Sequence, residues 1–267
     1  MAEPSSRLGN YFLRFATPFL GLRRVPVLGD ILSWTSRKLI PPESLIWVQI
    51  QQGPAEGLWI RVNPRTGQNV QKGIGEPEVQ RALFENLRLG MTFYDLGANM
   101  GFFSLIAARL VGNNGQVISF EADPEIALRL RENLARNQMT HAQVEQKAVW
   151  SEPSTVSFIR VDPNTSPDRG LGHVSAGSSD AGTITVEAVS LDDYAASHPA
   201  PDFVKCDVEG AELQVFQGAA KLLATKRPIL LVEMHSPENE RALGARFTDL
   251  GYRCTNIDET HMLALPQ

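Results

Sequence analysis

The sequence lacks several short patterns that mark common classes of binding protein. No Gly-Lys-Ser/Thr element is present, which excludes a P-loop that cradles nucleotide phosphates. The only two cysteines, Cys206 and Cys254, stand singly in apolar runs, so they offer neither zinc-ligand spacing nor a disulfide framework and are predicted to be buried free thiols. The apolar stretch at residues 11–22 is interrupted by Arg14 and Pro18, is too short to span a bilayer and is followed by no small-residue cleavage site. These absences predict a cytoplasmic protein.

Positive charge is scarce outside the first forty residues. Residues 1–40 carry six cations and two acids, whereas the remainder carries 19 cations and 28 acids. An acidic main body disfavours a nucleic-acid substrate. Residues 1–42 are predicted to form a helical arm before a main domain at 43–267. Within the arm, residues 5–40 pack on the domain or on a second subunit, or make peripheral membrane contact through an apolar face flanked by arginines.

The stretch from Thr92 to Asp123 predicts one strand–helix–strand unit. An apolar run ends in Asp95, and a turn containing Gly97, Asn99 and Gly101 leads into an amphipathic segment. Glycines at such a turn let the backbone bend sharply and approach a ligand, and the helix that follows presents free N–H groups.

A second apolar run ends in Glu121, and an acid at that place suits a pair of ribose hydroxyls. The turn has the spacing Asp-x-Gly-x-Asn-x-Gly and lacks the glycine that lets a pyrophosphate lie against the helix. A nucleoside without a phosphate chain is therefore the favoured ligand, which points to S-adenosylmethionine.

The rest of the chain alternates between predicted strands and helices, which is typical of an α/β fold with a mostly parallel sheet flanked by helices. A β-hairpin precedes this domain, and a long polar loop covers 162–182. The predicted strands are 44–50, 57–62, 92–95, a run ending at 121, 142–149, 155–160, 183–189, 203–207, a run ending at 235, and a closing pair within 252–265; the helices are 77–89, 102–111, 124–137, a short one at 191–194, 209–223 and 237–250.

Acids and one histidine fall at the carboxyl ends of several predicted strands. Such ends meet at one rim of a parallel sheet, where ligands bind. The residues expected there are Asp95, Glu121, Asp207, Glu209, Glu233 and His235. Three of the acids would permit a divalent cation without demanding one. Glu212, one turn into its helix, is interpreted as an acid that complements the helix dipole.

Five segments together resemble the FkbM-type methyltransferases: YDLGANMGFFSL, ISFEADP, VSLDDY, FVKCDVEGAELQVFQGA and PILLVEMH. The resemblance covers about residues 70–255 and rests on the combination of DxGANxG with DVEGAE. It implies the Rossmann-like class I methyltransferase fold, S-adenosylmethionine as donor, and O-methylation of a sugar, polyketide or other small metabolite. The N-terminal arm and the 162–182 loop match no motif of the family.

The resemblance also implies roles for individual residues. Asp95, Gly97, Asn99 and Gly101 would hold the methionine and ribose parts, Glu121 the ribose hydroxyls, and Ala148 the adenine edge. Asp207 and His235 are the catalytic candidates because an alcohol needs a base or a metal at neutral pH. Glu209 and Glu233 would contact the acceptor or join Asp207 around a cation. A nicotinamide-dependent oxidoreductase and a non-catalytic donor-binding scaffold are the alternatives.

Overall fold

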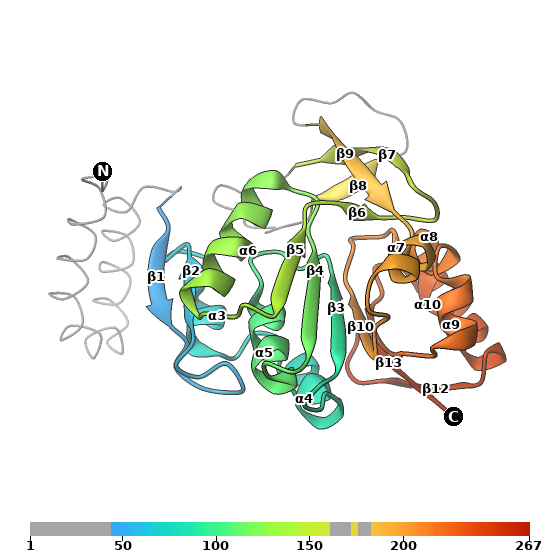
Figure 1. Cartoon of the computed structure of the whole chain (residues 1–267), viewed down its shortest axis with the longest axis horizontal. Helices are drawn as coiled ribbons and strands as arrows, with labels where there is room; N and C mark the ends of the chain where they lie inside the picture. The colour runs from blue at the N-terminus through green and yellow to red at the C-terminus, as the bar shows by residue number, and fades with distance from the viewer. Residues whose placement is uncertain (1–43, 161–171, 176–182) are drawn as a thin grey trace, which may run out of the picture.

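The computed structural model describes residues 44–160, 172–175 and 183–267, whose centre is a sheet of seven strands in the order β12-β13-β11-β10-β3-β4-β5 (Figure 1). The five strands from β11 to β5 are parallel, and β13 runs antiparallel to both of its neighbours. The chain order reverses between β3 and β10, so the crevice at their carboxyl ends is where a ligand is expected. The strands are β3 (Thr92–Leu96), β4 (Gln116–Phe120), β5 (Ala142–Glu145), β10 (Phe203–Cys206), β11 (Ile229–Glu233), β12 (Tyr252–Asn256) and β13 (His261–Pro266).

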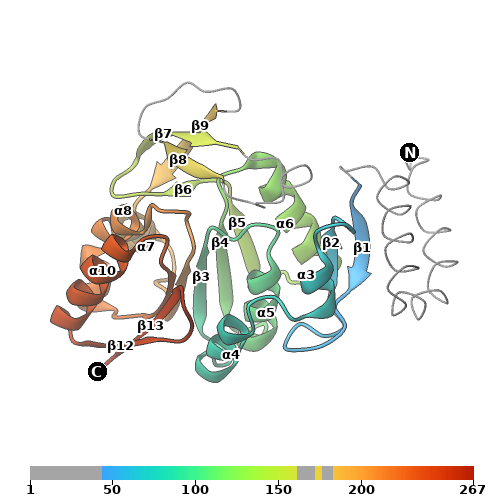
Figure 2. The same cartoon turned by 180° about the vertical axis from the view of Figure 1, so that it is seen from behind.

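Helices cover both faces of this sheet (Figures 1 and 2). Successive side chains of a strand point to opposite faces of the sheet, so the core has two parts. Phe93 packs in one cluster of buried side chains, and its neighbour Tyr94 packs in the other. The predicted mostly parallel α/β sheet is therefore confirmed. The helices α4 (Pro77–Asn86), α5 (Phe102–Val111) and α6 (Pro124–Arg136) contribute to the first cluster, and α7 (Leu191–Ser197), α8 (Glu212–Gln217), α9 (Ala220–Thr225) and α10 (Pro237–Asp249) to the second.

The predicted hairpin, β1 (Ile46–Gln49) with β2 (Trp59–Val62), packs beside α6 and is followed by the short helix α3 (Gln68–Lys72). Side chains of α6 bond the free edge of β2: Asn133 Oδ1 accepts from the Arg61 N–H at 2.8 Å. Asn137 accepts from the Trp59 N–H at 2.8 Å and donates to the Trp59 carbonyl at 2.6 Å. Amide side chains thus satisfy backbone groups that a neighbouring strand would otherwise pair.

A second sheet stands over the carboxyl rim of the first, with the order β6-β9-β7-β8 (Figure 1). Its strands are β6 (Ala148–Val149), β7 (Ser154–Ile159), β8 (His173–Ser175) and β9 (Thr183–Val189). The single strand predicted at 142–149 is wrong, because the chain leaves the main sheet after Glu145 and its next two paired residues join β9. The predicted 162–182 loop also contains β8; its other residues, except Gly172, lie outside the described segments.

The single helix predicted at 209–223 is two helices. It cannot begin at Glu209, because Glu209 and Gly210 have φ values of 53° and 96°, in the left-handed region. The second helix, α9, has its own cap from α7, since the Asp192 carboxylate accepts the N–H groups of Lys221 (2.9 Å) and Leu222 (2.7 Å). The predicted helix is therefore divided where Asp192, which belongs to α7, caps the start of α9.

The predicted arm at 1–42 and its membrane-contacting residues 5–40 fall outside the described part of the chain. Among the helices of the described segments, none combines the length and the apolar character that crossing a bilayer requires. Both cysteines are free thiols, as predicted; Cys206 is buried, but the prediction that Cys254 is buried is wrong, because that side chain is only partly buried.

Candidate active site

A cleft of about 790 Å³, open to solvent, lies at the carboxyl ends of β3, β4 and β10. The cleft lies at the reversal point of the main sheet, where ligands bind in folds of this kind. The second sheet supplies one wall. The lining residues are Gly97, Asn99, Phe120, Glu121, Ala122, Asp123, Ile126, Lys147, Ala148, Val149, Phe158, Gly172, Val174, Asp207, Val208, Glu209 and Ala211.

The glycine turn after β3 is shaped by close packing. Gly97 has φ 73°, and a Cβ added there would lie 1.8 Å from the carbonyl oxygen of Asp207. Gly101 has φ 88°, precedes α5, and would place a Cβ 2.1 Å from a methyl group of Leu130. Only glycine fits either position. Of the predicted donor-binding residues in this turn, Gly97 and Asn99 line the cleft and Gly101 does not.

Glu121 follows β4 and is fixed by backbone donors on both sides. Its Oε2 accepts from the Asn99 N–H and its Oε1 from the Asp123 N–H, each at 2.8 Å. The side chain is buried in the cleft wall, and burial raises the pKa of Glu121 to about 7. Glu121 thus lies in the cleft wall directly after β4, and its binding of ribose hydroxyls stays a prediction.

An ion pair holds the second sheet against the cleft. Arg160, just after β7, donates from Nε to Asp123 Oδ2 at 2.7 Å, and Asp123 Oδ1 also accepts the N–H groups of Glu125 and Ile126 at the start of α6. Phe158, two residues before Arg160 in the sequence, lines the cleft. Asp123 therefore caps α6 and positions the apolar wall at the same time.

Asp95 lies beneath the cleft and is not among its lining residues. It is fully buried, and its Oδ2 accepts from Ser104 Oγ at 2.6 Å. Ser104 is in turn bonded to Ser119 at 2.9 Å. Burial raises the pKa of Asp95, and the ammonium of Lys205 opposes that rise. The Asp95 carboxylate therefore does not line the cleft, and its contact with the methionine and ribose parts stays a prediction.

At the opposite end of the cleft, Asp207 follows β10 and pairs with Lys205. The Lys205 ammonium is buried and lies 3.1 Å from Asp207 Oδ2. The lysine charge holds the pKa of Asp207 below its usual range against the opposing effect of burial. Asp207 is therefore an ionised carboxylate at neutral pH and faces the cleft.

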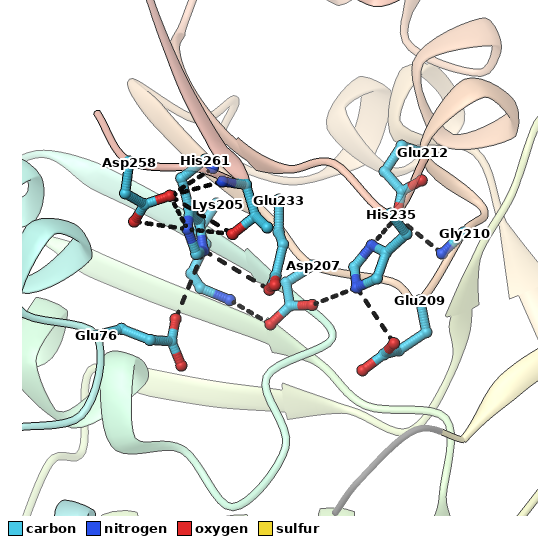
Figure 3. Close-up of polar contacts among 11 residues, drawn as sticks. Glu76, Lys205, Asp207, Glu209, Gly210, Glu212, Glu233, His235, Asp258 and His261 are labelled. Atoms are coloured by element: carbon cyan, nitrogen blue, oxygen red, sulfur yellow. Dashed lines mark hydrogen bonds and ion pairs between the residues drawn. The ribbon is translucent and has the colours of Figure 1, made fainter. Parts of the chain in front are cut away.

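His235, two residues past β11, is held between two carboxylates (Figure 3). Its Nδ1 is 2.8 Å from Glu212 Oε1 and its Nε2 is 3.2 Å from Glu209 Oε2. These partners raise the pKa of His235 to about 10. In this arrangement it is an imidazolium whose two N–H groups both donate, so it has no lone pair with which to act as the predicted base.

Glu233 ends β11 behind Asp207 and does not line the cleft, whereas Glu209 does. Burial and the charge of Asp207 raise the pKa of Glu233 to about 7. Asp207, Glu233 and His235 each offer one ligand atom, and these atoms lie within 4.8 Å of one another. This group differs from the set predicted for a cation, Asp207, Glu209 and Glu233, because His235 takes the place of Glu209.

Comparison with known proteins decides the family. The family model described as the methyltransferase FkbM domain matches residues 95–258, more than half of the chain. The chain belongs to the FkbM methyltransferase family. Membership confirms the resemblance seen in the sequence and the class I methyltransferase fold, and it favours methyl transfer over the oxidoreductase alternative.

Individual relatives of this FkbM-family chain match over part of their lengths. The hexuronic acid methyltransferase AglP of Haloferax volcanii is 30% identical over 164 residues, which cover 61% of this chain and 63% of AglP. An arsenite methyltransferase of Halobacterium salinarum is 34% identical over 95 residues, 36% of this chain and 23% of that protein. The chain thus spans less than two thirds of the length of these curated relatives.

The crystal structure of the FkbM methyltransferase from Methylobacillus flagellatus KT superposes with a TM-score of 0.48 at 17% identity. The superposition covers 76% of this chain and 55% of that one.

Sequence reasoning missed or misjudged several site residues of this family member. Lys205 is a lone charge in an otherwise apolar buried strand, a signal that was present in the run FVKC. Glu212 is fully buried and bonds His235 and Asn239 (2.6 Å), so its interpretation as a dipole-complementing acid was incomplete. His261 gave no signal of its own, because its partners come from distant parts of the chain.

Proposed function

We propose that this chain is an S-adenosylmethionine-dependent methyltransferase that methylates a hydroxyl group of a sugar or another small metabolite. The observation that carries the proposal is Glu121, a buried carboxylate in the cleft wall held by the N–H groups of Asn99 and Asp123. It stands where a nucleoside ribose binds in folds of this kind. Membership in the FkbM family supports the reaction class.

The cleft residues suit the parts of this donor. Glu121 would accept hydrogen bonds from the ribose hydroxyls. Gly97 and Asn99, in the turn before α5, would contact the donor next to the ribose. The adenine ring would lie toward Ala148 against the apolar wall that Phe158 and Val174 form. Adenine is flat and largely apolar, so burial between aliphatic and aromatic side chains stabilises it.

When bound, S-adenosylmethionine supplies a methyl group that is already activated on a sulfonium. The chain's contribution is alignment, exclusion of water and handling of one proton. We assign proton acceptance to Asp207, which lines the cleft as an ionised carboxylate. An Asp207 oxygen would accept the proton that the acceptor hydroxyl gives up when its oxygen is methylated.

His235 is proposed to position the acceptor side of the cleft. As a cation between Glu209 and Glu212, with Nε2 3.9 Å from Asp207 Oδ1, it fixes the direction in which Glu209 and Asp207 point. Glu209 lines the cleft and would accept from a second acceptor hydroxyl. A polyhydroxylated acceptor such as a sugar offers these neighbouring hydroxyls, and the likeness to a hexuronic acid methyltransferase supports that class.

The test is transfer of a labelled methyl group from S-adenosylmethionine to free and glycosidically linked hexuronic acids and neutral sugars, with product mass as the readout. The proposal expects a methylated acceptor with the full-length protein and with Glu259→Gln, an exposed control. Glu121→Ala should lose donor binding, and Asp207→Asn should keep donor binding and lose transfer. Donor binding without transfer to any of these acceptors would favour the non-catalytic scaffold, and tight binding of a nicotinamide dinucleotide in place of the donor would overturn the proposal.

A further inference from the structure

A second histidine, His261, has one ring nitrogen that makes ion-pair contacts with carboxylates but no hydrogen bond (Figure 3). His261 begins β13 and is only 4% exposed. Its Nδ1 lies 3.0 Å from both carboxylate oxygens of Asp258, which fixes the orientation of the ring. Its Nε2 is buried and has no hydrogen-bond partner. A buried polar nitrogen without a partner costs stability unless something binds it.

Two carboxylates converge on this nitrogen from different elements. Glu76 Oε2, at the start of α4, is 3.5 Å from His261 Nε2, and Glu233 Oε2, at the end of β11, is 3.6 Å away. Both separations exceed the range of about 2.7–3.2 Å for an N–H···O hydrogen bond. Two ligands that each bind one cation at about 2.1 Å lie roughly 3.0–3.4 Å apart, which is close to the separations seen here.

We propose that Glu76, Glu233 and His261 bind a divalent cation. The three ligand atoms lie within 4.8 Å of one another. Asp258 on the far ring nitrogen completes the carboxylate–histidine–metal arrangement that orients a ligating imidazole and strengthens it. One imidazole with two carboxylates suits Mn²⁺ or Zn²⁺ better than Ca²⁺, which takes oxygen ligands in larger number.

The geometry favours this set over Asp207, Glu233 and His235, which shares one glutamate with it. The two ring nitrogens of His235 are 2.8 and 3.2 Å from carboxylates outside that set, whereas the carboxylates nearest to His261 Nε2, at 3.5 and 3.6 Å, are the proposed ligands themselves. The neighbouring Lys205 ammonium is paired with Asp207 at 3.1 Å. A bound cation would tie α4, β11 and β13 together, so it should stabilise the fold independently of any methyl transfer.

The test is Mn²⁺ binding to the full chain after EDTA treatment and dialysis, followed by electron paramagnetic resonance of free Mn²⁺ and by the melting temperature. One equivalent should bind and the melting temperature should rise. Glu76→Gln changes a half-exposed side chain, so it leaves the fold intact and should weaken binding at least tenfold. His261→Gln should abolish binding, and Asp258→Asn should weaken it by about 10- to 100-fold.

Glu259→Gln is the matched control, because it removes the same charge from an exposed neighbour of Asp258 and should leave Mn²⁺ binding unchanged. The proposal is overturned if the unaltered protein binds no Mn²⁺. It is overturned equally if Glu76→Gln and Glu259→Gln weaken binding alike, or if binding survives His261→Gln and is lost in His235→Gln. Because the readout is metal binding, these outcomes are separate from the success or failure of methyl transfer.

Discussion

Replacing Glu121 by glutamine should stabilise the ligand-free protein at high pH. Burial raises the pKa of Glu121 from 4.5 to about 7. An acid with a higher pKa in the folded state binds more protons there, so the free energy of unfolding falls as pH rises from about 4.5 to about 7. A shift of this size corresponds to about 3 kcal/mol. Glutamine has the same shape and does not titrate, so it avoids that loss.

The substitution has a constant cost as well, because the amide NH₂ of glutamine faces one of the two N–H groups that Glu121 now accepts. That cost is about 1–2 kcal/mol and is independent of pH. The pH-dependent part is therefore the quantity to measure. The free energy of unfolding of Glu121→Gln, relative to that of the unaltered protein, should rise by about 2–3 kcal/mol from pH 5 to pH 8. This corresponds to roughly 5–10 °C in the difference between the two melting temperatures.

Donor affinity should move in the opposite direction. The loss of a charge-assisted hydrogen bond to the ribose, about 1.5–3 kcal/mol, weakens S-adenosylmethionine binding by roughly 10- to 100-fold at pH 8. Differential scanning fluorimetry at pH 5 and pH 8 measures the first effect, and isothermal titration calorimetry measures the second. A melting-temperature difference that is the same at both pH values would refute the buried-acid reasoning, and unchanged donor affinity would refute the ribose assignment.

Three further outcomes are expected. Gly97→Ala should lower the free energy of unfolding by more than about 2 kcal/mol, because its Cβ meets the Asp207 carbonyl at positive φ; a urea midpoint equal to that of the unaltered protein would contradict this. Asp207→Asn should lower kcat by about 100-fold or more with the donor Kd nearly unchanged, as separate turnover and calorimetry experiments would reveal. Arg160→Gln should weaken donor binding by a fewfold through loss of its ion pair with Asp123, and equal affinity would show that the second sheet needs no such anchor.

Features with local causes were predictable from the sequence. The strand–turn–helix at Asp95–Gly101 and the cap of α6 by Asp123 depend on residues close in the chain, so residue type and spacing reveal them. The place of Glu121 and Asp207 at strand ends followed in the same way. Their shared rim then followed from the parallel order of the sheet.

Features that depend on distant partners were not predictable. Glu212 is buried because His235 and Asn239, 23 and 27 residues away, supply its hydrogen bonds. The protonation of His235 likewise depends on Glu209, in the turn after β10. Its position after a strand suggested a base, whereas its carboxylate partners favour the cation. The break between β5 and β6 falls at the polar run Glu145-Gln146-Lys147, but the strand that Ala148 and Val149 then join, β9, lies far along the chain.

The carbonyl of Asp207 occupies the space that a side chain at Gly97 would fill. Two turns from strands that are neighbours in the sheet thus touch backbone to backbone, with no adjustable side chain between them. Under the proposed function, the distance from the donor-binding turn to Asp207 is consequently set by the backbone itself. A change of acceptor therefore has to leave this distance as it is and act through the side chains that line the cleft.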